Sequence, residues 1–302
     1  MSTSYHVAVI GLGAMGMGAA RSCLRAGLTT YGIDLSEQAR SQLQQAGAAA
    51  VMADARPLAE TLDAVLLLVV NAVQVRRILL GDEGLARHLK PGTAIMVSST
   101  IAAEEASALA AELAQLGLPM LDAPVSGGAI KADAGEMTVM AAGSDAAFDK
   151  LAPVLDAVAG KLYRVGSEPG QGSTVKIIHQ LLAGVHIAVA AEAMALASKA
   201  GVSLDLMYDV VTHAAGNSWM FENRMPRVLT GDYQARSAVD IFVKDLTLVA
   251  DTAKALRFPL PLASTALNMF LSASNAGHGQ EDDSAVIKTF SGITLPGQEE
   301  RP

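Results

Sequence analysis

The sequence of 302 residues is poor in cysteine, aromatic residues and charged residues. Cys23 is its only cysteine, which excludes an internal disulfide framework and a metal site built from several thiolates. Aromatic residues make up 4% and charged residues 17%, whereas 51% are hydrophobic, so the chain can bury a large core. The formal net charge is -8 and no long run of Lys or Arg occurs, so we expect neither nucleic acid nor an anionic membrane as a partner.

One apolar stretch, at 175–197, has the length of a membrane span. It also contains polar residues that would be costly in lipid, namely Lys176, His179, Gln180, His186 and Glu192. We therefore predict a buried helix of a soluble protein. The first residues show no basic segment followed by a long apolar one, so no secretion signal is expected and the predicted location is the cytoplasm.

Apolar segments alternate with helical ones through the first half of the sequence. The expected strands are 6–10, 29–33, 64–70, 94–98, 119–123 and 137–141, and helices are expected at 15–26, 36–45 and 102–116. The segment 65–70 (VLLLVV) is apolar at every position, which is typical of a parallel strand covered on both faces. The alternation predicts an α/β fold with a doubly wound parallel sheet.

A Gly- and Pro-rich segment, 166–172 (GSEPGQG), interrupts this pattern and indicates a domain boundary. A long helix is expected from Ser173 to about Ala200, and the remainder predicts further helices. These are 204–214, 221–229, 239–256 and 261–276. We predict one domain at 1–168 and an all-helical domain at 169–302.

A glycine pattern of the form G-x-G-x-x-G follows the first strand and opens the first helix. It consists of Gly11, Leu12, Gly13, Ala14, Met15 and Gly16. Such a turn lets the backbone approach a pyrophosphate at the N-terminus of a helix. The second strand ends at Asp34, whose carboxylate can accept hydrogen bonds from ribose hydroxyls and would repel a 2′-phosphate. We predict a dinucleotide site that prefers NAD to NADP.

Three later segments carry candidate site residues. Ser126, Gly127 and Gly128 follow the strand expected at 119–123 and can bind a carboxylate, although a plain turn explains the two glycines equally well. Lys176 and Gln180 share one helix face. A buried lysine favours an acid/base role, since burial lowers a lysine pKa, whereas a lysine that extends to solvent from the first turn is the alternative.

Lys244, in the segment FVKDL, either reaches a site or lies on the surface beside Asp245. The histidines do not predict a metal site. His179 and His186 lie on one helix face, but no carboxylate or cysteine completes a ligand set at helical spacing.

Together these motifs resemble the β-hydroxyacid dehydrogenase family, which includes 3-hydroxyisobutyrate dehydrogenase and tartronate semialdehyde reductase. The resemblance covers nearly the whole chain, through GLGAMG, the Ser98-Ser99-Thr100 strand end, DAPVSGG, G-x-x-x-K and FVKDL. It implies a Rossmann domain followed by an all-α domain, an active site in the cleft between them, and a homodimer or homotetramer.

The resemblance also implies roles for individual residues. Lys176 matches the catalytic lysine, and Ser126, Gly127 and Gly128 match the loop that binds the substrate carboxylate. The remaining matches are Val70, Asn71, Thr100 and Lys244, as cofactor contacts, and Gln180, as a substrate contact.

Many relatives carry two asparagines where this chain has His179 and Gln180. The segments VKIIHQLLAGVH, AAGNSWMFENR and FSGITLPG of this chain resemble those of one branch of the family. The resemblance implies the activity of that branch, whose members oxidise the sugar acid L-threonate at C2 to 2-oxo-tetronate. The alternatives are tartronate semialdehyde reductase, 3-hydroxyisobutyrate dehydrogenase and a non-catalytic dinucleotide-binding module. Retention of Lys176 disfavours the last.

Overall fold

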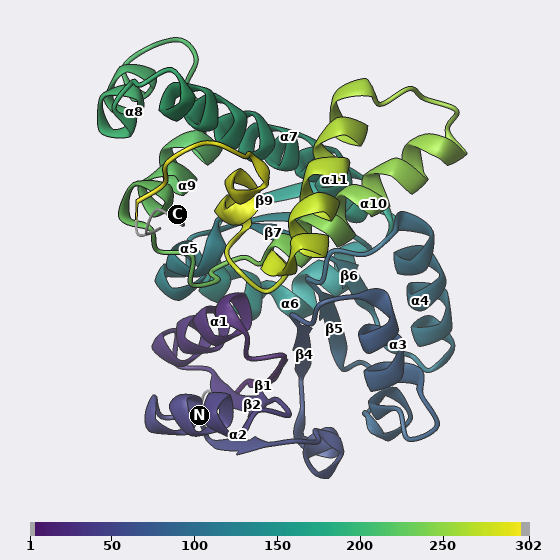
Figure 1. Cartoon of the computed structure of the whole chain (residues 1–302). Coiled ribbons are helices and arrows are strands. Elements are labelled where there is room, and N and C mark those ends of the chain that lie inside the picture. The colour runs from purple at the N-terminus through teal and green to yellow at the C-terminus, as the bar shows by residue number, and fades with distance from the viewer. Residues whose placement is uncertain (1–3, 297–302) are drawn as a thin grey trace. The chain divides into compact units, whose positions relative to one another are not determined.

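The computed structural model describes residues 4–296 (Figure 1). The chain forms two compact units, Met1–Lys176 and Ile177–Pro302, and one long helix crosses from the first to the second. The domain boundary predicted at 168/169 lies shortly before the start of this helix and stays a prediction.

The first unit contains one sheet of nine strands in the order β3-β2-β1-β4-β5-β6-β8-β7, with β9 beside β8. The strands are β1 (His6–Ile10), β2 (Thr29–Ile33), β3 (Ala50–Met52), β4 (Ala64–Leu67), β5 (Ala94–Val97), β6 (Met120–Asp122), β7 (Val125–Ser126), β8 (Met137–Ala142) and β9 (Ala159–Gly166). The first six strands along the chain, β1 to β6, are all parallel to one another. By contrast, β8 is antiparallel to β6 and β7 and parallel to β9.

Helices cover both faces of this sheet. They are α1 (Ala14–Arg25), α2 (Glu37–Gln45), α3 (Ala72–Leu80), α4 (Ala103–Gln115), α5 (Gly128–Ala134) and α6 (Asp145–Val158), with 3-10 helices η1 (Arg56–Thr61) and η2 (Leu85–His88). Alternate strand residues face opposite sides. Val7 and Val9 of β1 pack with α1 and α6, and Ala8 and Ile10 pack with α3 and α4. The doubly wound parallel sheet is therefore confirmed.

The order of the strands places a change of direction at β1. From β1 the chain proceeds to β2 and β3 on one side, and it then returns to β4 on the other side of β1. Ligands of doubly wound folds bind outside the carboxyl ends of the strands at such a switch point. The glycine turn begins at Gly11, directly after β1.

The second unit is helical, which confirms the predicted all-α domain. Its elements are the continuation of α7 (Gln171–Lys199), then α8 (Leu204–Thr212), α9 (Trp219–Thr230), α10 (Val239–Ala255) and α11 (Pro261–Ala273), followed by η3 (Ser274–His278) and η4 (Asp283–Thr289). Its core contains Ile187 and Met194 of α7, Phe242 and Leu246 of α10, and Phe270 of α11. A Cβ atom on Gly184 would lie 2.8 Å from Leu246, so this glycine lets α7 approach α10 closely.

By length and composition α7 is apolar enough to cross a membrane, and half of its most apolar window is buried inside the protein. The prediction of a buried helix therefore holds for one half of this window.

One predicted strand is too long. The segment expected at 64–70 leaves the sheet after Leu67. Asn71 begins the capping of α3 by accepting the N–H of Gln74, and Gln74 in turn accepts the N–H of Val70. The apolar character of 64–70 did not reveal that the backbone N–H of Val70 bonds to a side chain of α3 instead of a neighbouring strand.

Candidate active site

The glycine turn has the backbone geometry that a dinucleotide requires. Gly11 has a φ of 91°, which side-chain-bearing residues rarely adopt, and a Cβ on Gly16 would lie 1.7 Å from the Gly11 carbonyl oxygen. A Cβ on Gly13 would meet nothing within 4 Å, so the surface above this residue is open. Gly13 is also the N-cap of α1 and provides no side-chain cap, which leaves the helix start suited to a phosphate group.

Asp34 lies at the end of β2 beside this turn. Its Oδ2 accepts the N–H of Leu12 at 2.6 Å, and its Oδ1 accepts the N–H of Ser36 at 2.7 Å. The guanidinium of Arg40 donates to the Asp34 carbonyl oxygen at 2.7 Å. A half-buried carboxylate next to the turn fits the ribose hydroxyls of NAD.

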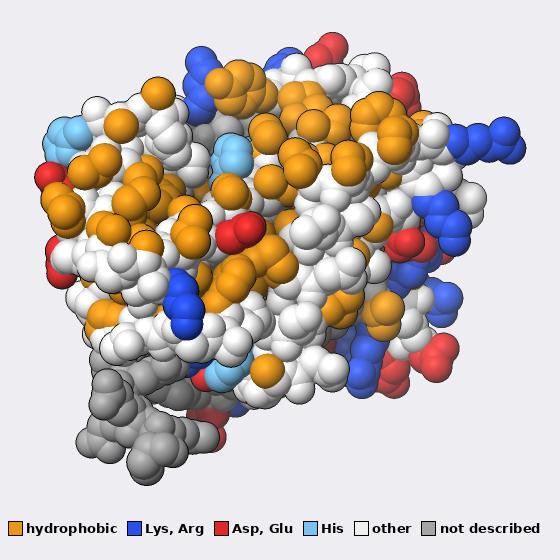
Figure 2. All heavy atoms as spheres, turned by 45° about the horizontal axis from the view of Figure 1, so that its top comes forward, with side chains coloured by type: hydrophobic (Ala, Val, Ile, Leu, Met, Phe, Trp, Pro, Cys, Tyr) orange, Lys and Arg blue, Asp and Glu red, His pale blue; other side chains and the backbone are white. Residues whose placement is uncertain are grey.

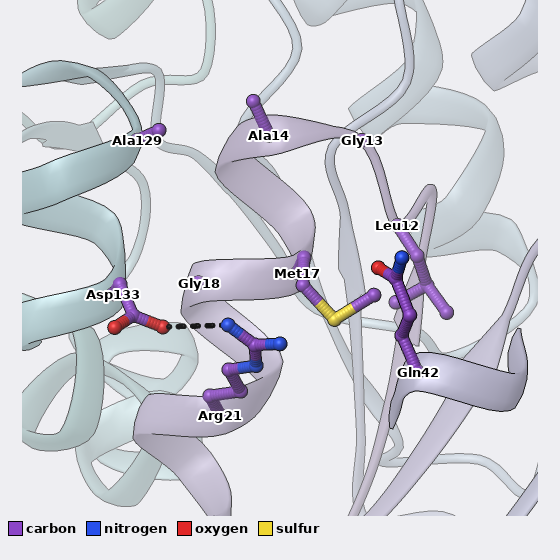
Figure 3. Close-up of a pocket in the computed structure, with 9 residues that line it drawn as sticks. All are labelled: Leu12, Gly13, Ala14, Met17, Gly18, Arg21, Gln42, Ala129 and Asp133. Carbon is purple, nitrogen blue, oxygen red and sulfur yellow. Dashed lines mark hydrogen bonds and ion pairs between the residues drawn. The ribbon is translucent and has the colours of Figure 1, made fainter. Parts of the chain in front are cut away.

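A pocket of about 270 Å³ adjoins the glycine turn (Figure 3). It is lined by Leu12, Gly13, Ala14, Met17, Gly18, Arg21, Gln42, Ala129 and Asp133, from the turn, α1, α2 and α5. Arg21 points toward Asp133 across the pocket, and their closest charged atoms are 3.4 Å apart. The hollow extends from the start of α1 along its side.

The other cofactor residues predicted in this unit follow neighbouring parallel strands. Val70 and Asn71 come after β4, and Thr100 comes after β5. Because β1, β4 and β5 are parallel neighbours, their carboxyl ends share one edge of the sheet. Before Thr100, Ser98 and Ser99 have buried hydroxyls that lack a hydrogen-bond partner among the described residues.

The predicted carboxylate loop follows β6 at the same edge. Ser126 ends the short strand β7, which pairs with β8. Gly127 and Gly128 have φ values of 130° and 71°, so both occupy backbone conformations that favour glycine. Gly127 is the N-cap of α5. A Cβ atom on Gly127 would lie 2.8 Å from Lys131, whereas one on Gly128 would meet nothing within 4 Å, so the surface is open at Gly128.

Lys176 lies in the second turn of α7 and is 5% exposed. The start of this helix is bound by Asp122, the last residue of β6. The Asp122 carboxylate accepts the N–H groups of Gly170 and Ser173, each at 2.8 Å, and the Ser173 hydroxyl at 2.7 Å. The prediction did not include Asp122, although it opens the DAPVSGG motif.

In the second unit, Gln180 and Lys244 meet at one carboxylate. Gln180 donates from Nε2 to Asp245 at 2.5 Å, and the Lys244 ammonium lies 2.7 Å from the other Asp245 oxygen. A ring nitrogen of His179 lies 3.0 Å from Gln180 Oε1, which is consistent with a donating Nδ1–H. Asp245 is 2% exposed and was also missed as a site residue. The only sequence signal was its position directly after Lys244.

Residues 4–296 contain no group of three or more His, Cys, Asp or Glu side chains arranged to hold a metal ion.

Comparison with known proteins agrees with this geometry. Residues 6–166 match the family described as the NAD binding domain of 6-phosphogluconate dehydrogenase. Residues 170–290 match the family described as NAD-binding of NADP-dependent 3-hydroxyisobutyrate dehydrogenase. With Asp34 beside the glycine turn, these matches confirm the prediction of an NAD cofactor.

Similar proteins extend over the whole chain. An L-threonate dehydrogenase of Escherichia coli is 72% identical and the match covers 98% of each chain. An L-threonate dehydrogenase of Pectobacterium atrosepticum is 67% identical over 100% of this chain and 99% of its own. A solved structure described as 3-hydroxyisobutyrate dehydrogenase of Salmonella typhimurium is 69% identical, with a TM-score of 0.92, over 95% of this chain and 100% of that one.

These matches confirm the predicted resemblance and the class of enzyme, an NAD-dependent dehydrogenase acting on a CH–OH group. The chain belongs to the β-hydroxyacid dehydrogenase family, whose members include 3-hydroxyisobutyrate dehydrogenase.

Proposed function

We propose that this enzyme oxidises L-threonate at C2 to 2-oxo-tetronate with NAD. The observation that carries the proposal is the high identity to L-threonate dehydrogenases over essentially the full chain. The His179-Gln180 pair supports it, because its longer polar side chains suit a substrate with additional hydroxyls.

The residues of the first unit have complementary tasks in this reaction. Ser126, Gly127 and Gly128 bind the substrate carboxylate through a hydroxyl and backbone N–H groups. Lys176, as a neutral amine, accepts the proton of the C2 hydroxyl. NAD, when bound at the glycine turn, supplies the acceptor for the hydride that leaves C2. The alcohol thereby loses two electrons and two protons in all and becomes a ketone.

The second unit provides the other two polar site residues. Gln180 contacts substrate and Lys244 contacts the cofactor in this proposal. The shared carboxylate of Asp245 supports these roles, because it holds both side chains in defined positions.

A second candidate is 3-hydroxyisobutyrate dehydrogenase, which the description of the Salmonella structure favours. Tartronate semialdehyde reductase is the further alternative within the family. Residues 179 and 180 favour L-threonate over the substrates of these two alternatives. Many relatives with those activities carry two asparagines at these positions, where this chain has His179 and Gln180.

A substrate panel tests the proposal. The purified enzyme is assayed through reduced-nicotinamide absorbance with L-threonate, other four-carbon aldonates and 3-hydroxyisobutyrate, each with NAD and NADP. We expect the highest kcat/KM with L-threonate and NAD. Activity on 3-hydroxyisobutyrate without activity on L-threonate would overturn the substrate and leave the enzyme class intact.

The same assay tests the lysine. Lys176→Met should lower kcat by about 10²- to 10⁴-fold, the usual contribution of a general base. Lys199→Met is the control, since Lys199 is an exposed lysine at the other end of α7. Full activity of Lys176→Met would contradict the mechanism.

We also propose that the enzyme is a homodimer or homotetramer in the cytoplasm. Exposed apolar side chains line one face of α7, which we call the α7 stripe: Ile178, Leu182, Val189 and Leu196. Leu182, Val189 and Leu196 recur every two helical turns, as in helices that pack lengthwise on another. Figure 2 shows hydrophobic side chains gathered on the face that Figure 1 has at its top, where α7 runs. A second copy of the chain would cover them.

A further inference from the structure

The start of α7 is capped by a residue from elsewhere in the chain. Gly170 accepts the first helical N–H, from Thr174, and as the N-cap it has no side chain to cap the helix. The Asp122 carboxylate provides that cap. It accepts the N–H of Ser173, 51 residues later, together with the hydroxyl of the same serine.

The helix start also touches the sheet directly. A Cβ atom on Gly172 would lie 2.4 Å from the Asp122 carbonyl oxygen and 2.6 Å from that of Met140, distances that real Cβ atoms do not show. The first turn of α7 therefore packs against Asp122 at the end of β6 and against Met140 within β8. Asp122 and Ser173 are 0% and 1% exposed, so no solvent separates these parts.

Lys176 lies one helical turn after the residues of α7 that contact the sheet, Gly172 and Ser173. It comes three residues after Ser173 and four after Gly172, which puts it on the helix face that contains both. Asp122 also begins the loop that leads to Ser126 and Gly127. One carboxylate thus connects the loop assigned to the substrate with the helix turn before the lysine.

We propose that Asp122 is a positioning residue, which sets the place of Lys176 relative to the substrate loop through its hydrogen bonds to the start of α7. The inference rests on the proposed function of Lys176. Asp122 itself takes no part in the proton transfer, because its two oxygens are already engaged by Gly170 and Ser173.

The environment of Asp122 explains why a carboxylate suits this place. Burial raises the pKa of its carboxyl overall, and the hydrogen bonds from Ser173 and Gly170 offset only part of that rise. The N-terminal end of the helix dipole further favours a negative charge. An amide in its place would turn a donor toward these donors and loosen the first turn.

Asp122→Asn and the milder Ser173→Ala test the inference. We expect Asp122→Asn to lower kcat with L-threonate by about 10- to 100-fold, since a shift near 1 Å in a reacting group has effects of this size. Ser173→Ala removes only one of the hydrogen bonds to Asp122 and should lower kcat several-fold. It tests the inference if Asp122→Asn fails to fold. The dissociation constant for NAD should change by less than about twofold in both, because Asp34 and the glycine turn are untouched.

Asp63→Asn is the matched control. Asp63 also accepts a backbone N–H of the same unit, that of His6 at 2.9 Å, but it precedes β4 and so lies at the opposite edge of the sheet. The kcat of Asp63→Asn should stay near that of the wild type, even if this variant loses as much thermal stability as Asp122→Asn. If kcat falls equally in all three variants, or only in proportion to lost stability, Asp122 is merely structural and the inference is overturned.

Amide hydrogen exchange gives a readout that does not depend on turnover. Asp122→Asn should increase exchange in the peptide at 168–176 and leave that at 29–33 unchanged. Unchanged exchange at 168–176 would contradict the capping role.

Combination with Lys176→Ala separates this inference from the proposed function. In that background Asp122→Asn should cost no further activity, because it acts through the lysine. A multiplicative further loss overturns the positioning role. Full activity of Lys176→Ala alone overturns the proposed function of the lysine, whereas an inactive Lys176→Ala beside a fully active Asp122→Asn overturns only the inference.

Discussion

At the scale of single residues, we propose that Asp34 sets the preference for NAD over NADP. Its carboxylate accepts two backbone N–H groups, from Leu12 and Ser36, and remains half-buried beside the glycine turn. Arg40 lies close by but donates to the Asp34 and Leu35 carbonyl oxygens. In this proposal the carboxylate of Asp34 would repel a 2′-phosphate, while Arg40 is engaged by backbone carbonyl oxygens.

Asp34→Asn should lower kcat/KM for NAD by about 10- to 100-fold, the loss expected for hydrogen bonds to a charged group. The ratio of NADP to NAD use should rise, because the repulsion of a 2′-phosphate is removed. Initial rates with both cofactors measure this. Asp54→Asn is the control, since Asp54 accepts a backbone N–H two residues ahead in the same way. An unchanged NADP/NAD ratio would contradict the assignment.

At the scale of elements, two ion pairs fasten η4 to α9. Arg224 binds both oxygens of Asp283, at 2.7 and 2.9 Å, and Arg227 binds Asp282. Both carboxylates are fully buried. Although burial by itself would raise the pKa of Asp282, the hydrogen bonds from Arg227, Ser284 and the Arg236 N–H together lower it. A carboxyl with a lowered folded pKa stabilises the fold above its unfolded pKa and loses this effect as pH falls through the folded value.

Arg227→Met should therefore reduce the free energy of unfolding at neutral pH by about 3–5 kcal/mol, because a buried carboxylate loses its partner. The difference from wild type should narrow as pH falls below 3.8, the ordinary pKa of an aspartate, since Asp282 becomes protonated. Trp219, the single tryptophan, begins α9 and reports unfolding by fluorescence. Arg236→Met, which removes an exposed pair with Asp232, is the control and should change little. A pH-independent difference would argue against this account.

At the scale of the whole molecule, the α7 stripe predicts assembly. Its four side chains are 52–68% exposed, which is unfavourable for an isolated chain in water. The double variant Leu182→Lys/Val189→Lys should lower the mass of the protein, measured by light scattering after gel filtration, to that of the monomer. Leu116→Lys, an exposed leucine at the end of α4, should leave the mass unchanged. A wild-type monomer would exclude the stripe as a subunit interface.

Local patterns were sufficient for the first part of the fold. Strands at 6–10 and 29–33 have the predicted bounds, because each is a short apolar run between turn signals. By contrast, β9 was not predicted. None of its residues Ala159–Gly166 is buried, and they mix Lys, Tyr and Arg with apolar residues, so neither an apolar run nor strict alternation marks them. Its pairing with β8 forms it.

The sequence by itself determined the glycine turn, Asp34 and the alternation of strands and helices, since each depends on neighbours within a few residues. Only the tertiary structure decided the partners of buried charges. Asp122 meets Ser173 across 51 residues, and Gln180 meets Asp245 across 65. No periodicity records such contacts, because a carboxylate in the sequence looks the same whether it will face water or cap a distant helix.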